Sequence, residues 1–252
     1  MTSPFMDEVY EAAVDLVRNA IEQLKEIWND FVEAFNKALK VVPGYLNPGL
    51  VHAMKKLSSW FGDMMEKVWK VYTERGSAGA VRAVAGDWNT EVGGKASTQA
   101  GLLVLGQLPT TGFWSGTAGS RYIHVVNGQN KALADVKTIT DNLQTTLNEI
   151  AEAMRTFWRT LAVSVGGYVA LMAGCAASAM FGVTAVVAIP AAVGFTVAFI
   201  GVLNDLTLDF SNALDAKEAK LRQLITTDSS FASGAWPPST ADALAEAAAT
   251  GP

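Results

Sequence analysis

Hydrophobic residues recur at helical spacing along most of the chain. Over residues 7–40 they alternate with acids and lysines, as in an amphipathic helix that buries one face. The apolar positions of that face are Val9, Leu16, Leu24, Ile27, Phe31, Phe35 and Leu39. Two prolines and two glycines within residues 42–49 end this helix, and a second amphipathic pattern follows over 50–74. The pattern therefore predicts an N-terminal helical hairpin over residues 1–75.

A second helical hairpin is predicted over residues 76–158. It begins at a Gly-Ser-Ala-Gly sequence, and an alanine- and glycine-rich, weakly helical stretch then extends to about residue 108. After a turn at 109–116 comes the most regular helical pattern, over 118–158, with a heptad-like seam of apolar residues. The seam consists of Leu133, Val136, Ile139, Leu143, Leu147, Ile150, Met154 and Phe157. We expect it to be buried against a helix of the same or another chain.

Residues 159–205 form a third segment, because the 45 residues from Thr160 to Asn204 include no charge. One bilayer crossing takes about 20 apolar residues. The segment therefore predicts a transmembrane-type hairpin of two arms, with its turn near Gly182 and Thr184. Small residues at four-residue spacing suit close helix contact in lipid, and a proline is expected to kink the second arm. These positions are Ala170, Gly174, Ser178, Gly194 and Ala198 for the small residues, Pro190 for the kink, and Phe199 within the second arm.

Beyond the hairpin, the pattern predicts a return helix over 206–227 and a disordered tail over 228–252 that is rich in Ser, Ala, Pro and Gly. The return helix is expected to run antiparallel to the 118–158 helix. The fold class predicted for the chain is therefore all-α, an elongated helical bundle with both ends of the apolar hairpin on the same side of a membrane.

Composition excludes several classes of function. The formal net charge is −5, which argues against a nucleic-acid partner, since such proteins normally carry a basic stripe. One cysteine, Cys175, and two histidines, His52 and His124, leave little material for a metal site or acid–base chemistry. No phosphate-binding loop or hydrolase motif is present. We therefore expect no enzymatic activity, no cofactor and no small-molecule substrate. The N-terminus also has no basic and apolar regions of a signal peptide.

One motif points to a known family. Trp114-Ser115-Gly116 lies between two helical patterns, and small residues follow it, with Val126, Gln129 and Leu133 further on. Over residues 78–157 the chain resembles the WXG family of type VII (ESX) secretion substrates of actinobacteria. The resemblance implies a structural turn at Trp114 and Gly116 between two antiparallel helices, and a helical partner of WXG type. It also implies export by a route that needs no signal peptide.

The family's export signal, Tyr-x-x-x-Asp/Glu, is missing here, because none of the five tyrosines has an acid four residues later. Either a partner carries the signal, or this chain is not itself exported by that route.

The favoured function is a non-enzymatic WXG-type protein that acts on or inserts into a lipid membrane through its apolar hairpin, including the formation of a pore, as a homo-oligomer or with a WXG-type partner. The layout resembles that of the α-helical pore-forming toxins of the cytolysin A type. Two alternatives stay open. The chain is a constitutively membrane-anchored accessory of the secretion machinery, or the apolar segment is the core of a water-soluble bundle. Any water-soluble form must cover the hairpin, with the helices at 7–40 and 50–74 as the candidate cover.

Overall fold

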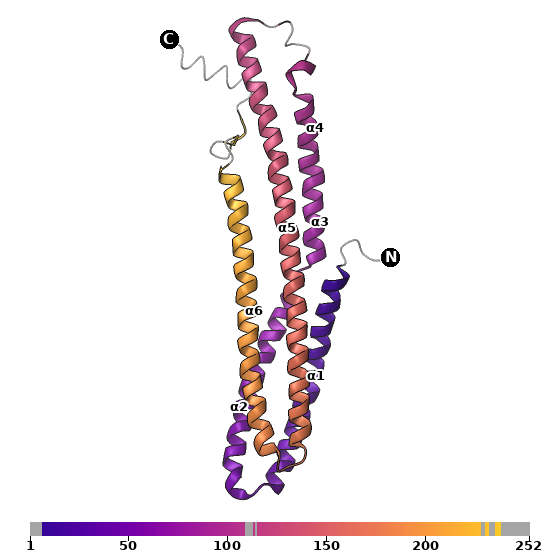
Figure 1. The fold of residues 1–252 in the computed structure, drawn as a ribbon, viewed down its shortest axis with the longest axis vertical. Helices are drawn as coiled ribbons and strands as arrows, with labels where there is room; N and C mark the ends of the chain where they lie inside the picture. The colour runs from indigo at the N-terminus through magenta and orange to yellow at the C-terminus, as the bar shows by residue number, and fades with distance from the viewer. Residues whose placement is uncertain (1–6, 109–112, 114, 228–229, 232–234, 238–252) are drawn as a thin grey trace. The chain divides into compact units, whose positions relative to one another are not determined.

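A computed structural model describes residues 7–108, 113, 115–227, 230–231 and 235–237 (Figure 1). Nearly all of these residues are helical and none of them forms a strand, so the all-α expectation is confirmed. The elements are α1 (Glu8–Val41), η1 (Gly44–Leu46), α2 (Asn47–Thr73), α3 (Ala78–Asp87), η2 (Trp88–Gly94), α4 (Lys95–Leu102), η3 (Leu105–Gln107), α5 (Gly116–Ala179) and α6 (Ala185–Thr227). Among the short elements, η2 is a π-helix, whereas η1 and η3 are 3-10 helices.

The two long helices pass without a break through the segment boundaries that the sequence suggests. α5 continues through residues 158–159 and α6 through 205–206, and Pro190 lies inside α6. At both boundaries the sequence changes from amphipathic to apolar without a helix-breaking residue. The change in polarity therefore alters the surroundings that suit each part of the helix, and the helical backbone continues through it. Most of the predicted tail, residues 228–252, lies outside the described residues.

The chain divides into two compact units, and α5 and α6 contribute to both. The first unit contains Met1–Ala78 and Glu152–Ala213, and the second contains Gly79–Ala151 and Leu214–Pro252. In the first unit, α1 and α2 lie alongside the parts of α5 and α6 that flank the turn between them (Figure 1). This arrangement is a four-helix bundle, and its core contains most of the apolar side chains of α1 and α2, although Val9 and Leu16 of the predicted apolar face are exposed.

Local sequence explains how the first hairpin is built. Asp7 is the N-cap of α1, and its carboxylate accepts a hydrogen bond from the Tyr10 amide at 3.2 Å. Helix α1 ends just before Pro43, which cannot donate the next backbone hydrogen bond. Pro48 stands in the first turn of α2, where a missing amide hydrogen costs nothing. The rings of Trp28 and Phe61 stack with their centroids 4.7 Å apart and join the two helices.

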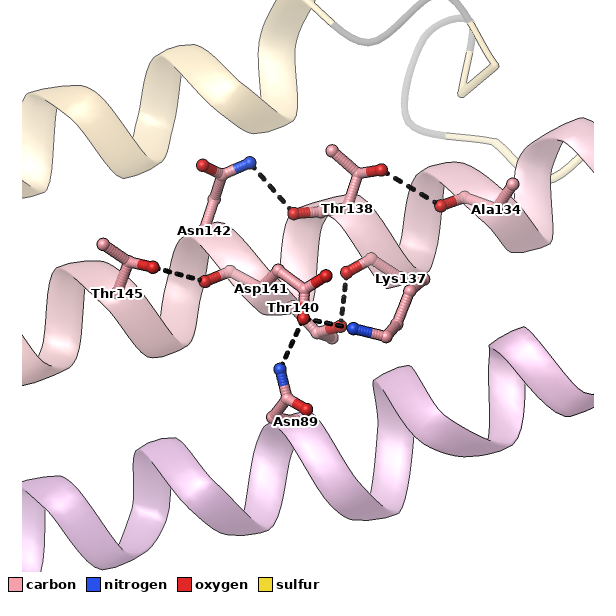
Figure 2. A network of polar contacts seen from close by, with 8 residues as sticks. All are labelled: Asn89, Ala134, Lys137, Thr138, Thr140, Asp141, Asn142 and Thr145. Carbon is pink, nitrogen blue, oxygen red and sulfur yellow. Dashed lines mark hydrogen bonds and ion pairs between the residues drawn. The ribbon is translucent and has the colours of Figure 1, made fainter.

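In the second unit, the α3–η2–α4 segment runs antiparallel to the first part of α5. The Asn89 amide donates to the Asp141 carboxylate, and the Asn130 amide donates to the Ala100 carbonyl, at 2.5 Å in each case. The later residue of the α3–η2–α4 segment thus contacts the earlier residue of α5, as it must when two helices are antiparallel. Figure 2 shows the centre of this interface, where Asp141 accepts hydrogen bonds from Asn89 and Lys137.

Gly93, in the π-helix, allows the closest approach in this interface. A methyl group at Gly93 would overlap the hydroxyl oxygen of Thr140 and lie 3.1 Å from its Cβ. Glycine, which has no side chain, leaves room there for the Thr140 side chain. The glycine-rich character of residues 78–108 therefore has a packing role at this position.

The heptad-like seam is buried less than predicted. Met154 and Phe157, in the first unit, are buried, but the six seam residues from Leu133 to Ile150, in the second unit, are only half-buried. The fully buried positions there include small or polar residues, namely Ala132, Thr140, Thr146 and Ala151. Within this chain the seam of the second unit is thus only partly buried, and its burial against another chain stays a prediction. The few helices of this unit enclose a narrower core than the four-helix bundle does.

Candidate functional site: the apolar hairpin and its helical cover

The apolar hairpin turns at residues 180–184, between α5 and α6. Gly182 occupies the turn with φ at +71°, a conformation that side-chain-bearing residues rarely adopt. Its amide donates to the Ala179 carbonyl at 3.1 Å, its carbonyl accepts from the Ala185 amide at 3.1 Å, and the Thr184 hydroxyl bonds the Ser178 carbonyl. The turn therefore satisfies its own polar groups between two apolar arms.

A buried polar pair joins the two arms. The hydroxyls of Tyr168 on α5 and Thr196 on α6 lie 2.8 Å apart, and the Tyr168 ring stacks on Phe199 with centroids 4.6 Å apart. The Thr196 hydroxyl also bonds the Ala192 carbonyl at 2.8 Å. Because Thr196 donates to that carbonyl, it accepts from Tyr168, and both hydroxyls are satisfied within the hairpin. The pair needs neither water nor another helix.

Helices α1 and α2 cover one face of the hairpin. The inward residues of the arms recur about once per helical turn, in two places on α6 as adjacent pairs, and are fully or almost fully buried. They are Leu161, Val165, Tyr168, Met172, Ala176 and Ala179 on α5, and Ala185, Ala188, Ile189, Ala192, Thr196, Phe199, Ile200 and Leu203 on α6. The opposing residues of the cover are apolar as well, among them Val17, Leu24, Phe31, Leu57 and Met64. The contact between hairpin and cover is therefore mainly hydrophobic.

In the part of the chain that the structure describes, several polar contacts join the cover to α5 and α6. Arg155 of α5 donates through Nη2 to both carboxylate oxygens of Asp7, at 3.0 and 2.9 Å. Lys67 of α2 donates to the Asn204 side chain at 2.8 Å, and Lys37 of α1 lies 3.9 Å from the Met180 sulfur. These polar contacts fix the register of α1 and α2 against α5 and α6. Burial of apolar side chains provides most of the attachment.

Tyr10 fixes the start of α1 within the first unit. Its hydroxyl donates to the Gly76 carbonyl at 2.6 Å, and its ring meets that of Trp158 edge-on at 6.0 Å. Burial disfavours the charged phenolate and raises the pKa of Tyr10 to about 12. The phenol therefore remains neutral and able to donate throughout the physiological range.

The other face of the hairpin is exposed. Val163 and Val187 are 77% and 73% accessible, and Leu171, Val197 and Val202 are also exposed. In the most apolar 18-residue window, 33% of α5 and 39% of α6 is buried. Each is long and apolar enough to cross a membrane.

The small residues of the arms do not form the expected helix contact. Ala170, Gly174 and Ser178 on α5 are exposed, and so are Gly194 and Ala198 on α6. A methyl group at Gly174 or Gly194 would meet no atom within 4 Å. The arms instead bury larger side chains, such as Tyr168, Met172 and Ile189, together with a set of alanines. The predicted contact across these small residues is thus wrong for this structure, whereas Phe199, named only as part of an arm, lies at the contact.

The structure places the remaining predicted site residues as follows. Trp114 lies outside the described residues, whereas Gly116 is the first residue of α5 and has φ at +79°. Pro190 is exposed on α6. The sequence analysis missed Asp7, Arg155 and the Tyr168–Thr196 pair as contacts. An Asp before an amphipathic helix is a capping signal, but no local pattern links it to a partner 148 residues away.

The described residues offer no sign of a metal centre. They include no group of three or more His, Cys, Asp or Glu side chains that could hold an ion. Comparisons of the chain with protein-family models, with curated proteins and with solved structures find no match.

Proposed function

We propose that this chain is a non-enzymatic WXG-type protein of a type VII secretion pathway that inserts its apolar hairpin into a lipid membrane. The observation that carries the membrane part is the half-covered hairpin. Forty-five residues without a charge form two arms and a turn, and two amphipathic helices cover one face. The WXG part rests on the Trp114-Ser115-Gly116 sequence between two antiparallel helices.

The contacts suggest how insertion proceeds. The cover is held mainly by apolar burial, and a bilayer offers the inner face of the hairpin an equally apolar environment. Once α1 and α2 separate from the arms, their own apolar faces fit the bilayer interface while their charged faces remain in water. The Tyr168–Thr196 hydrogen bond stays within the hairpin, so the arms enter lipid without an unsatisfied hydroxyl from this pair.

The test uses one substitution at two glycines of the same helix. Gly174→Arg places a charge in the first arm, at an exposed position where an added Cβ atom meets nothing within 4 Å, so we expect the lipid-free fold to be retained. An arginine within the hydrocarbon costs roughly 2.5–3.5 kcal/mol on the insertion scale. Gly128→Arg is the matched control, because a Cβ atom at Gly128, which is half-buried, also meets nothing within 4 Å, and the residue lies in α5 outside the charge-free segment.

Circular dichroism and size exclusion in buffer, then flotation and dye leakage with vesicles, give the readout. We expect both variants to fold, Gly128→Arg to cause leakage like the wild type, and Gly174→Arg to lose leakage. Phe199→Arg should misfold even without vesicles, because its site is buried. If Gly174→Arg folds and still causes leakage as the wild type does, the insertion proposal is wrong.

A second candidate is a constitutively anchored accessory of the secretion machinery. Basic residues flank both ends of the charge-free segment, which favours retention of both ends on the cytoplasmic side. They are Arg155, Arg159, Lys217, Lys220 and Arg222. Fractionation separates the candidates. An anchored accessory sediments with membranes when newly made, whereas an inserting protein is found first in the soluble or culture fraction.

A further inference from the structure

One end of the first unit brings together two loops that are far apart in sequence. The turn between α5 and α6 lies against the end of α1, because a Cβ atom at Gly182 would be 3.5 Å from the Cβ of Val41. Lys37, one turn earlier in α1, lies 3.9 Å from the Met180 sulfur. Figure 1 shows the α1–α2 connection and the α5–α6 turn at this end. We call residues 41–47 and 180–187 the apolar tip.

The tip exposes large apolar side chains. Tyr45 and Phe181 are 81% and 80% accessible, and Val41, Val183 and Val187 are exposed as well. Exposed apolar groups gathered at one place mark an interaction surface more often than scattered single residues do. An aromatic ring with a polar edge, such as that of Tyr45, favours the headgroup level of a bilayer.

The charge around the tip has the opposite sign to that of the whole chain. No Asp or Glu occurs between Glu33 and Asp63, or between residues 160 and 204, although the chain has a net charge of −5. Four exposed lysines lie in the helices next to the tip, namely Lys37, Lys40, Lys55 and Lys56. Lys37 pairs with Glu33, which leaves the other three as the main source of positive charge there.

We propose that the apolar tip docks on a bilayer of anionic phospholipid before the hairpin inserts. The proposal rests on the proposed function, and it names the surface of the protein and the class of lipid that make the first contact. Lysines near an anionic leaflet are attracted to it electrostatically, and Tyr45 and Phe181 enter the headgroup layer. A second copy of the chain fits this surface less well, because two tips face to face would place their lysines against each other.

Two variants of the full chain separate the contribution of the lysine charges from that of the aromatic rings. Lys40→Gln/Lys55→Gln/Lys56→Gln removes three positive charges at the tip, and Arg18→Gln/Lys25→Gln/Lys70→Gln removes three from α1 and α2 farther from it. Tyr45→Ser/Phe181→Ser removes the rings, and Phe113→Ser is its control, since Phe113 is 88% exposed in the second unit. Flotation is measured with vesicles of phosphatidylcholine alone and with phosphatidylglycerol added.

We expect the wild type to float with the anionic vesicles at least tenfold more than with the neutral ones. Both tip variants should lose most of this binding, and both controls should keep it. Equal flotation with the two compositions, or tip variants that float like their controls, overturns the tip proposal and leaves insertion standing. A wild type that floats with neither composition overturns both proposals. A dimer in solution that the tip variants dissociate, with vesicle binding unchanged, assigns the tip to a second copy and overturns the bilayer as its occupant.

Discussion

The carboxylate of Asp7 has two partners at once, the first turn of α1 and the guanidinium of Arg155 on α5. The Asp7 side chain is 3% exposed and that of Arg155 is 24% exposed, so their ion pair is largely shielded from water. The pair joins the beginning of the cover to the beginning of the hairpin. It is the strongest polar restraint between them among the described residues, since charged partners form stronger hydrogen bonds than neutral ones.

Replacing Asp7 by Asn keeps a capping side chain and removes the charge. We expect Asp7→Asn to lower the free energy of unfolding by about 1–3 kcal/mol, the scale for weakening a shielded charged hydrogen bond. Membrane insertion should become faster, because the cover separates more readily. Urea unfolding and the rate of vesicle leakage are the measurements. Asp15→Asn is the control, because its pair with Arg18 is more than half exposed and should contribute less than about 1 kcal/mol. Equal effects of the two substitutions would show that the Asp7–Arg155 pair contributes no more to stability than an exposed ion pair does.

Gly93→Ala tests the close approach of the π-helix to α5. The added methyl group overlaps the Thr140 side chain, and we expect a loss of about 1–3 kcal/mol in the stability of the second unit. The double variant Gly93→Ala/Thr140→Ala should recover part of the loss. Gly86→Ala is the control in the same stretch, because a methyl group there meets nothing within 4 Å and alanine favours the helix. Thermal melting of all four proteins checks this, and a stable Gly93→Ala variant would show that the interface is wider than described.

The network in Figure 2 predicts a dependence of stability on pH. The hydrogen bond from Lys137, helped by that from Asn89, holds the pKa of the Asp141 carboxyl below its ordinary value of 3.8. A carboxyl whose pKa is lower in the folded than in the unfolded chain stabilises the fold above the unfolded pKa. The contribution is lost as the pH falls through the folded pKa.

Asp141→Asn should therefore be less stable than the wild type at pH 7, by less than about 1 kcal/mol because the side chain is half exposed. The difference in melting temperature should shrink as the pH is lowered from 5 toward 3. Melting curves of the two proteins at a series of pH values measure it. A difference that stays constant down to pH 3 would mean that the Asp141 charge has no part in stability.

Local pattern was enough to predict the helical class and the place of the hairpin turn. An uninterrupted charge-free run is visible without knowledge of the fold, and Gly182 supplies a positive φ that few other residues tolerate. The inward face of each arm could not be predicted, because residues 160–204 are apolar on all sides and provide no amphipathic pattern.

Contacts between distant segments were beyond the sequence for a different reason. The Tyr168–Thr196 and Asp7–Arg155 pairs depend on which helices pack together. The identity of a single residue of a common type does not indicate which distant residue it will contact. The seam from Leu133 to Ile150 shows a related limit of prediction from sequence. Its periodicity was read correctly as helical, but the degree of burial depends on how many helices surround it.

Cys175 offers the most direct test of hairpin insertion. It is the only cysteine of the chain, lies in the first arm and is partly exposed, so we expect the unmodified protein to react with a water-soluble maleimide in buffer. The measurement is the labelling rate with and without anionic vesicles, for the wild type and for Gly174→Arg. We predict that vesicles slow labelling of the wild type at least tenfold, because the thiol enters hydrocarbon, and leave Gly174→Arg unchanged. A wild-type chain that floats with vesicles while Cys175 labels at its rate in buffer would contradict insertion of the hairpin.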